Sequence, residues 1–353
     1  MPPGRRPIVA VPARNEAERL PALMDALAAQ TWCGSGERLA VVVVLNNCSD
    51  DSADVLSAAA MRHPQLEVAV QEVLLTAPDA HVGAARRLAM EAALGIANGE
   101  PCALLTTDAD ATPEAQWVIA NLAALEAGAD LVGGRIIGDP VEEARLGPGF
   151  QRRVARHLHY AELADRLADS IDPIAHDPVP RHGDHTGASL AVRGDVYAAL
   201  GGMPALPFRE DVAFVTRARA AGYRLRHAPE ARVKVSARLV GRAPGGMADC
   251  LRAWIRAEAE DQPQLVESVD RLTARLRLRR AIRTGAVAGA PSVVASPSCA
   301  WLDGWRIDPD ASQVWVELWA GDDLDTPGDT PIEHAITRIE GLLQELDAYV
   351  DAA

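Results

Sequence analysis

The chain has 353 residues, of which 48% are hydrophobic and 24% are charged, and its 49 acidic and 35 basic residues give a formal net charge of −14. This composition is that of a globular protein with a hydrophobic core, built as one large domain or two smaller ones. A strongly negative surface repels duplex nucleic acid, so we expect no nucleic acid partner. A local basic cleft can still bind a nucleotide.

No segment of the sequence is typical of a membrane or secretory element. Ile8 to Val11, the apolar run after the basic N-terminus, is too short for a signal peptide. No stretch reaches the roughly 18 uninterrupted apolar residues that a membrane helix requires. The cysteines form no Cys-x-x-Cys pair, which favours reduced thiols: Cys33, Cys48, Cys102, Cys250 and Cys299. We therefore expect a soluble, cytoplasmic protein without a membrane span.

The first half of the chain alternates short β-branched runs with amphipathic helical segments. Leu39–Leu45 is a continuous apolar run, typical of a strand buried on both faces. Strict alternation predicts an α/β fold with a mostly parallel sheet flanked by helices. The other predicted strands are Ile8–Val11, Glu67–Leu75, Cys102–Thr106 and Asp130–Val132, and the predicted helices are Ala17–Gln30, Asp51–Arg62, Gly83–Ile96 and one that opens at Thr112-Pro113-Glu114.

Later segments are mainly helical. A strand is predicted at Gly187–Val192, and helices at Arg152–Ser170, Gly194–Leu200, Asp211–Gly222, within Met247–Arg283 and at Thr330–Tyr349. A basic, glycine-rich stretch ends near residue 246, so we expect one domain over 1–245 and a mainly helical extension over 246–353. This extension is expected to cover the acceptor side or to form a homodimer interface. Its tryptophans more often pack a core than stack on a sugar: Trp301, Trp305, Trp315 and Trp319.

Polar segments follow three of the predicted strands. In an open parallel sheet, ligands bind at the carboxyl ends of the strands. The segments are Pro12-Ala13-Arg14-Asn15-Glu16, Asn46-Asn47-Cys48-Ser49-Asp50 and Thr107-Asp108-Ala109-Asp110. Their carboxylate and amide groups predict a ligand site at this edge of the sheet.

Asp108 and Asp110 lie one residue apart, directly after a buried strand. Paired carboxylates suit Mg²⁺ or Mn²⁺, whose other positions are filled by phosphates and water. A cation that bridges a diphosphate neutralises charge as the diphosphate leaves. The alternative is that both aspartates only cap a turn before Thr112-Pro113.

Two further motifs suit a phosphorylated ligand. The amides of Asn46 and Asn47, with Asp50, can bind a base edge or ribose hydroxyls, and they can equally form an Asx turn. Arg86, in the first turn of a predicted helix, is a suitable partner for diphosphate oxygens, whereas Arg87 is expected to face solvent.

An acidic pair, Glu210-Asp211, opens another predicted helix. One of these carboxylates, placed opposite a metal-bound diphosphate, can take the proton from an acceptor hydroxyl. Asp211 can also cap the helix, and capping is compatible with catalysis.

Taken together and in this order, the motifs resemble those of the family 2 glycosyltransferases, which have the GT-A fold. Pro12 to Glu16 is similar to the family's P-x-x-N-E strand end, Asn46 to Ser52 to its D-G-S-T-D-D-T segment, and Asp108-Ala109-Asp110 to its DxD motif. His185-Thr186-Gly187 to Arg193, with Gly201-Gly202, looks like its acceptor-side stretch, and Glu210-Asp211 looks like its ED pair. The resemblance covers about residues 7 to 240.

The resemblance implies that this chain moves a sugar from a nucleotide-diphosphate sugar, linked to UDP or GDP, to a hydroxyl acceptor. Asp110 would be the principal ligand of Mg²⁺ or Mn²⁺, with Asp108 between ribose and metal, and Asp211 would be the base of an inverting reaction. Donor-side residues would be Pro12, Ala13, Asn15, Glu16, Asn46, Asn47, Asp50, Arg86, Thr107, Asp108 and Ala109. The acceptor would lie among His185, Thr186, Gly187, Glu210, Asp211, Arg238 and Arg242.

The chain departs from the family pattern at two places. Leu45 stands where a carboxylate is common, so the resemblance does not assign the base. The Q-x-x-R-W motif of processive members has no match, which argues against a membrane-embedded polymerase. Two other functions are compatible with the pattern: a nucleotidyltransferase, although the segment after the first strand lacks glycine, and a non-catalytic nucleotide-sugar-binding protein.

Overall fold

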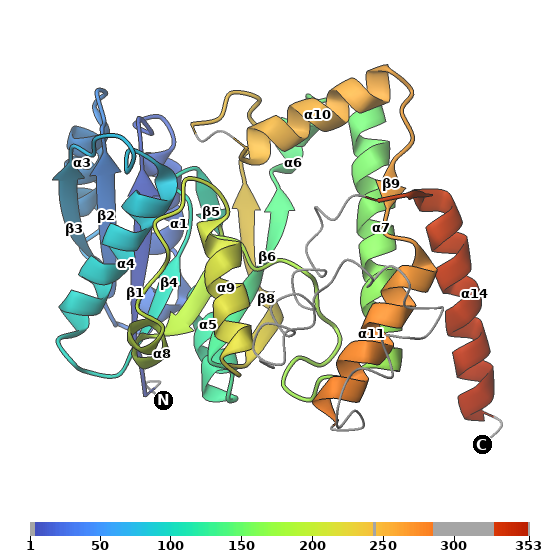
Figure 1. Ribbon diagram of the computed structural model, residues 1–353. Helices are drawn as coiled ribbons and strands as arrows, with labels where there is room; N and C mark the ends of the chain where they lie inside the picture. The colour runs from blue at the N-terminus through green and yellow to red at the C-terminus, as the bar shows by residue number, and fades with distance from the viewer. Residues whose placement is uncertain (1–3, 243–244, 285–327, 352–353) are drawn as a thin grey trace. The chain divides into compact units, whose positions relative to one another are not determined.

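The computed structural model describes residues 4–242, 245–284 and 328–351 (Figure 1). The tryptophan-rich segment and Cys299 therefore lie outside the described residues. The chain forms two compact units. The first comprises 1–145, 184–218 and 222–253, and the second comprises 146–183, 219–221 and 254–353. The boundary expected after residue 245 does not follow this division, because the helix after residue 147 belongs to the second unit.

The first unit is built on an eight-stranded sheet with the order β3-β2-β1-β4-β7-β6-β8-β5. Parallel pairing joins β3, β2, β1 and β4, and also β6 and β8, whereas β7 and β5 pair antiparallel with their neighbours. The strands are β1 (Arg6–Ala13), β2 (Leu39–Asn46), β3 (Leu66–Val73), β4 (Cys102–Thr106), β5 (Ala111–Pro113), β6 (Leu131–Gly138), β7 (Leu190–Arg193) and β8 (Leu225–Val235). The predicted α/β fold with a largely parallel sheet is confirmed.

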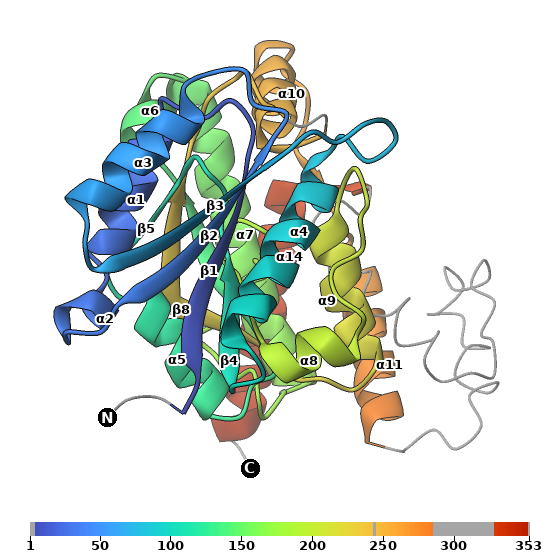
Figure 2. The same cartoon turned by 90° about the vertical axis from the view of Figure 1, so that its left-hand side faces the viewer.

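Helices cover both faces of this sheet, as the edge-on view in Figure 2 shows. Alternate residues of β1 and β2 enter opposite cores, so β1 is apolar from Pro7 to Ala13 and β2 from Leu39 to Leu45. One core packs α1 (Leu20–Ala28), α3 (Ser52–Arg62) and α5 (Trp117–Glu126), and the other packs α4 (Val82–Ala97), α8 (Gly194–Ala199) and α9 (Glu210–Ala220). Each Leu, Val or Ile buried in these cores contributes about 1.5–3 kcal/mol. This packing gives the loops at the ends of β1, β2 and β4 a rigid base.

One prediction about the first unit is wrong, and one strand was not predicted. The helix expected to open at Thr112-Pro113-Glu114 begins only at Trp117, because residues 111–113 form β5 and pair with β8. Pro113 fits there because β5 is an edge strand, where a missing N–H is tolerated. The sequence also gave no prediction for β8, the longest strand of the sheet.

The short elements of the first unit are α2 (Thr31–Gly34) and α6 (Pro140–Ala144). Helix α10 (Met247–Ala259) starts in the first unit and ends in the second.

The second unit is mainly helical. Helices α7 (Pro148–Ile171), α11 (Val269–Arg283) and α14 (Ile332–Asp351) pack through apolar residues, and α7 and α14 run side by side in Figure 1. A small two-stranded sheet joins β9 (Leu265–Val266) to β10 (Thr330–Pro331). Buried Asp172 accepts hydrogen bonds from Arg279 and Arg283, so its charge is paired. The predicted helical character of this part of the chain is confirmed.

No helix among the described residues is long and apolar enough to cross a membrane. Cys33, Cys48 and Cys102 are free thiols.

Candidate active site

The loops that follow β1 and β2 are tied to each other by side-chain hydrogen bonds. Asn15 Oδ1 accepts from Ser49 N at 2.8 Å, and Asp50 Oδ2 accepts from Ala17 N at 3.0 Å. Asp50 Oδ1 also accepts from Ser52 N and Oγ. Asn15 has a φ of +54°, a left-handed conformation that asparagine tolerates better than most residues. These bonds hold the chain where Glu16 turns toward the end of β4.

The side-chain amides of Asn46 and Asn47, at the end of β2, form hydrogen bonds with the protein backbone. Asn47 exchanges two hydrogen bonds of 2.9 Å with the backbone of Leu75. Asn46 is buried and donates through Nδ2 to His81 O at 3.4 Å, while its Oδ1 has no hydrogen-bond partner within the described residues. The turn geometry of Asp50 matches the Asx alternative recognised in the sequence. Asn46 Oδ1 is thus a buried polar atom of this segment that no described group satisfies.

Arg86 of α4 is the centre of a buried network. Its Nε donates to Glu210 at 2.8 Å, and its Nη2 donates to Asp108 at 2.8 Å. Its Nη1 donates to Thr106 Oγ1 at 3.0 Å and to Gly187 O at 2.9 Å. The side chains of Arg86 and Glu210 are each 4% exposed. Burial lowers the pKa of Arg86, but the charges of Asp108, Glu210 and Asp211 together outweigh it and raise the pKa.

These contacts show how three of the predicted site residues are held. Each nitrogen of the Arg86 guanidinium donates to a protein group, so Arg86 positions Asp108. Glu210 is buried against Arg86. Thr107, expected beside the donor, is fully buried and donates to Ala188 O at 2.8 Å. The three residues form a scaffold.

Asp211, at the start of α9, accepts a hydrogen bond of 2.5 Å from Gly187 N and one of 2.8 Å from Val212 N. Gly187 O accepts a hydrogen bond from Arg86, so Gly187 connects Asp211 to the network around Arg86. Unlike Glu210, Asp211 is only partly buried. Its carboxylate is therefore fixed in orientation and retains access to solvent.

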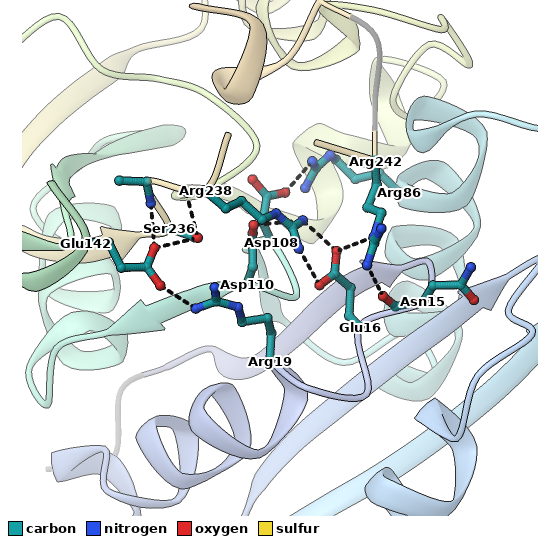
Figure 3. A network of polar contacts seen from close by, with 11 residues as sticks. Asn15, Glu16, Arg19, Arg86, Asp108, Asp110, Glu142, Ser236, Arg238 and Arg242 are labelled. Atoms are coloured by element: carbon teal, nitrogen blue, oxygen red, sulfur yellow. Dashed lines mark hydrogen bonds and ion pairs between the residues drawn. The ribbon is translucent and has the colours of Figure 1, made fainter. Parts of the chain in front are cut away.

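A second network joins the turn after β4 to the segment after β8 (Figure 3). Arg238 Nη1 and Nη2 contact Glu16 Oε2 and Oε1 at 2.8 and 2.6 Å, a two-point pairing of guanidinium with carboxylate. Arg238 Nη2 also lies 2.9 Å from Asp110 Oδ2. Arg242 donates to Asn15 O at 3.1 Å and lies 3.7 Å from Glu16. Both arginines, expected on the acceptor side, thus contact the loop after β1, which was expected to bind the donor.

Asp110 sits in an electrostatically unfavourable position. Burial, together with the charge of Asp108, raises the pKa of Asp110 to about 6, and Arg238 offsets only part of this effect. A nearby cation lowers the free energy of the ionised carboxylate. The turn is therefore suited to binding positive charge.

His185 is buried and its Nδ1 lies 3.3 Å from Nε2 of His227 in β8. The ring is thereby engaged with β8, whereas the adjacent backbone at Gly187 contacts Asp211. In this segment, the structure brings Gly187 rather than the His185 side chain to the candidate site.

Gly187 is required by the close approach of Arg86. A Cβ added at Gly187 would lie 2.3 Å from Arg86 Cζ. Because protein groups hold the guanidinium on several sides, we expect Gly187→Ala to lower the free energy of unfolding by about 1–3 kcal/mol. Gly183→Ala, in the same loop, meets no atom within 4 Å and should change it little. Urea denaturation of both variants tests this; equal stabilities would contradict it.

Comparison with known proteins identifies the domain that carries these loops. Residues 8–176 match the sequence model of Glycosyl transferase family 2. The chain contains a family 2 glycosyltransferase domain. This match confirms the resemblance, and with the observed sheet it confirms the expected GT-A fold class and the expected enzyme class, a glycosyltransferase. No curated protein sequence is similar enough to count as a match.

Solved glycosyltransferase structures are similar to this chain at low identity. A mannosyltransferase from Pyrobaculum calidifontis in complex with GDP-Man and Mn²⁺ is 18% identical, with 98% of this chain and 82% of that chain covered and a TM-score of 0.45. S. aureus TarS 1–349 in complex with UDP-GlcNAc is 14% identical, with 96% and 92% covered and a TM-score of 0.49. Glucosyl-3-phosphoglycerate synthase from Mycobacterium tuberculosis is 15% identical, with 74% and 83% covered and a TM-score of 0.40.

Proposed function

We propose that this family 2 glycosyltransferase transfers a sugar from a nucleotide-diphosphate sugar to a hydroxyl acceptor, with a divalent cation at Asp108 and Asp110 and with inversion at the anomeric carbon. The nucleotide would be linked through UDP or GDP. Glu16 and Asn46 would lie beside the nucleoside, and Asp211 would be the catalytic base.

One observation carries this proposal. Arg86 contacts both Asp108, from the turn after β4, and Glu210, from the start of α9, at 2.8 Å each. These motifs are about a hundred residues apart in the sequence. The shared arginine brings the candidate cation ligands and the candidate base, Asp211, to the same place. A donor phosphate and an acceptor hydroxyl must meet in that way for a single displacement.

The donor set fits a divalent cation that is bound together with a diphosphate. Hydrogen bonds and ion pairs to arginine engage one oxygen each of Asp108 and Asp110. No group of three or more His, Cys, Asp or Glu side chains that could hold a metal ion occurs in the described residues, so phosphate oxygens would complete the coordination. The site is also acidic: Glu16, Asp108, Asp110, Glu210 and Asp211 outnumber Arg86, Arg238 and Arg242. An anionic diphosphate therefore needs added positive charge to bind.

Each of these residues would then have its own role in the reaction. Asp108 and Asp110 hold the cation, which stabilises the negative charge on the departing nucleoside diphosphate. Arg86 keeps Asp108 in place, and the N–H of Gly187 keeps Asp211 pointing in one direction. Asp211 accepts the proton of the acceptor hydroxyl as its oxygen attacks the anomeric carbon. One displacement from the side opposite the diphosphate inverts the configuration.

A donor panel tests the reaction and the cation. The protein would be incubated with UDP-linked and GDP-linked sugars and Mn²⁺, and release of nucleoside diphosphate would be followed. We expect one nucleotide class to be hydrolysed slowly without acceptor, and addition of EDTA to lower that rate by about a hundredfold, because several kcal/mol of charge stabilisation are lost. Adding excess Mn²⁺ should restore the rate.

Other outcomes would contradict the proposal. Release of pyrophosphate from a nucleoside triphosphate would indicate a nucleotidyltransferase. Binding of a nucleotide sugar without any turnover, across a panel of alcohol acceptors, would indicate a binding protein. Full activity in EDTA would show that the reaction needs no divalent cation. A product with the donor's anomeric configuration would contradict the inverting mechanism.

A further inference from the structure

The guanidinium of Arg238 lies between two carboxylates of the donor side, as Figure 3 shows. It is 2.6 Å from Glu16 Oε1 and 2.9 Å from Asp110 Oδ2, both measured from Nη2. The side chain of Glu16 is 5% exposed, and those of Asp110 and Arg238 are each 21% exposed. These charges therefore interact with little screening by solvent. Arg238 supplies positive charge at the carboxylate to which the proposed function assigns the cation.

We propose that Arg238 and the divalent cation compete for Asp110, so that the cation binds well only together with the diphosphate of the nucleotide. This inference rests on the proposed function. A cation at Asp110 and the guanidinium at 2.9 Å from the same carboxylate repel each other, so one must withdraw. The phosphate oxygens of the donor are suitable new partners for the displaced guanidinium.

The surroundings of Arg238 allow its side chain to move while the backbone stays fixed. Glu142 Oε2 accepts hydrogen bonds of 2.8 Å from Ser236 Oγ and from Ala237 N, directly before Arg238. Glu142 is itself paired with Arg19 of the loop before α1. The main chain is thus anchored up to Ala237, and rotation about the side-chain bonds of Arg238 suffices to release Asp110.

Competition of this kind has a thermodynamic consequence. If the nucleotide takes Arg238 away from Asp110, it raises the affinity for the cation, and the cation must raise the affinity for the nucleotide by the same factor. Arg238 therefore makes the binding of the two ligands cooperative. It also prevents the acidic turn from binding a divalent cation tightly in the absence of donor.

Titration of Mn²⁺ alone, followed by the electron paramagnetic resonance signal of free Mn²⁺, tests the proposal without any turnover. We expect Arg238→Gln to bind Mn²⁺ more tightly than the wild type, by a factor on the order of 5–150, the usual range of such couplings. In the wild type, saturating UDP or GDP should increase Mn²⁺ affinity by a comparable factor, and in Arg238→Gln this increase should be smaller.

The matched control is Arg232→Gln. Arg232 belongs to β8, the strand that leads to Arg238, is exposed and pairs with Glu114 at 3.6 Å. Its replacement removes the same charge and a longer, more exposed ion pair outside the site. We expect unchanged Mn²⁺ affinity. An equal gain in both variants would show a general effect of net charge and would overturn the proposal.

Asp110→Asn separates this inference from the proposed function. Loss of Mn²⁺ binding in Asp110→Asn, with no gain in Arg238→Gln, would overturn the competition and leave the cation site standing. Unchanged Mn²⁺ binding in Asp110→Asn would overturn both. If circular dichroism showed that Arg238→Gln is unfolded, the wild-type titrations with and without nucleotide would still test the proposal. Equal Mn²⁺ affinities of the wild type in the two titrations would contradict the competition.

Discussion

Asp211→Asn is expected to lower the turnover number by about 10²- to 10⁴-fold, the usual contribution of a general base, and to leave nucleotide affinity within about twofold of the wild type. Asparagine has nearly the same shape, and its single side-chain oxygen can still accept the hydrogen bond from Gly187 N, so the loop should keep its place. The second bond, from Val212 N, is lost. It cannot take a proton from an acceptor hydroxyl. Steady-state rates with the preferred donor, and calorimetric titration with the nucleoside diphosphate, give the two quantities.

The matched control for Asp211→Asn is Asp270→Asn. Asp270 is also an aspartate of a first helical turn, in α11, and it is exposed. We expect full activity from this variant. If Asp211→Asn lost nucleotide affinity by as large a factor as turnover, Asp211 would be a donor-binding residue. Unchanged turnover in Asp211→Asn would show that Asp211 is not the base.

Loops at the ends of β1, β2 and β4 were predictable because two rules act together. Continuous apolar runs such as Leu39–Leu45 are typical of strands buried on both faces, and such strands usually belong to parallel sheets, which bind ligands at the carboxyl ends of their strands. The observed register, with Val11 opposite Val43, brings the segments that begin at Pro12 and Asn46 to that edge. Local pattern and global fold therefore agree in this half of the chain.

Strand β8 was not predictable from its residues. Its segment alternates buried positions with Arg226, Glu230, Arg232 and Lys234 and contains Pro229, so no apolar run marks it. It is held as a strand by pairing with β6 and β5, which are distant in sequence. Propensity is a weak guide when tertiary pairing decides. The contacts of Arg238, which follows β8, with Glu16 and Asp110 were not predictable for the same reason.

The role of Arg86 could not be read from its sequence position either. An arginine in the first turn of a helix beside a phosphate-type loop suits a diphosphate contact. The structure instead shows Arg86 as a buried residue that is 4% exposed. Its N–H groups donate to Thr106 and Asp108 at the end of β4, to Gly187 and to Glu210. Contacts of that kind depend on the folded chain. The one feature of the sequence related to this role is Gly187. It lies next to Arg86 in the folded chain, and its missing side chain leaves space for the guanidinium.

Arg86→Met is expected to lower the free energy of unfolding by about 3–5 kcal/mol, because it leaves Glu210 as an uncompensated buried charge. Asp108 loses the same partner, but its side chain is 38% exposed and water can solvate it. The main loss therefore comes from Glu210. Urea denaturation at pH 7 measures the change, and nucleotide binding should weaken at the same time because Asp108 is released.

Arg87→Met is the matched control for Arg86→Met, since the residues are adjacent in α4. Arg87 pairs with Glu91 on an exposed surface, with side chains 40% and 43% exposed, so its loss should cost only about 0.3–0.5 kcal/mol. The double variant Arg86→Met with Glu210→Leu replaces the buried pair by apolar groups, and it should be more stable than Arg86→Met alone. If the double variant were instead the less stable, the deficit of Arg86→Met would not come from the charge of Glu210, and lost packing around Thr106 and Gly187 would be the cause.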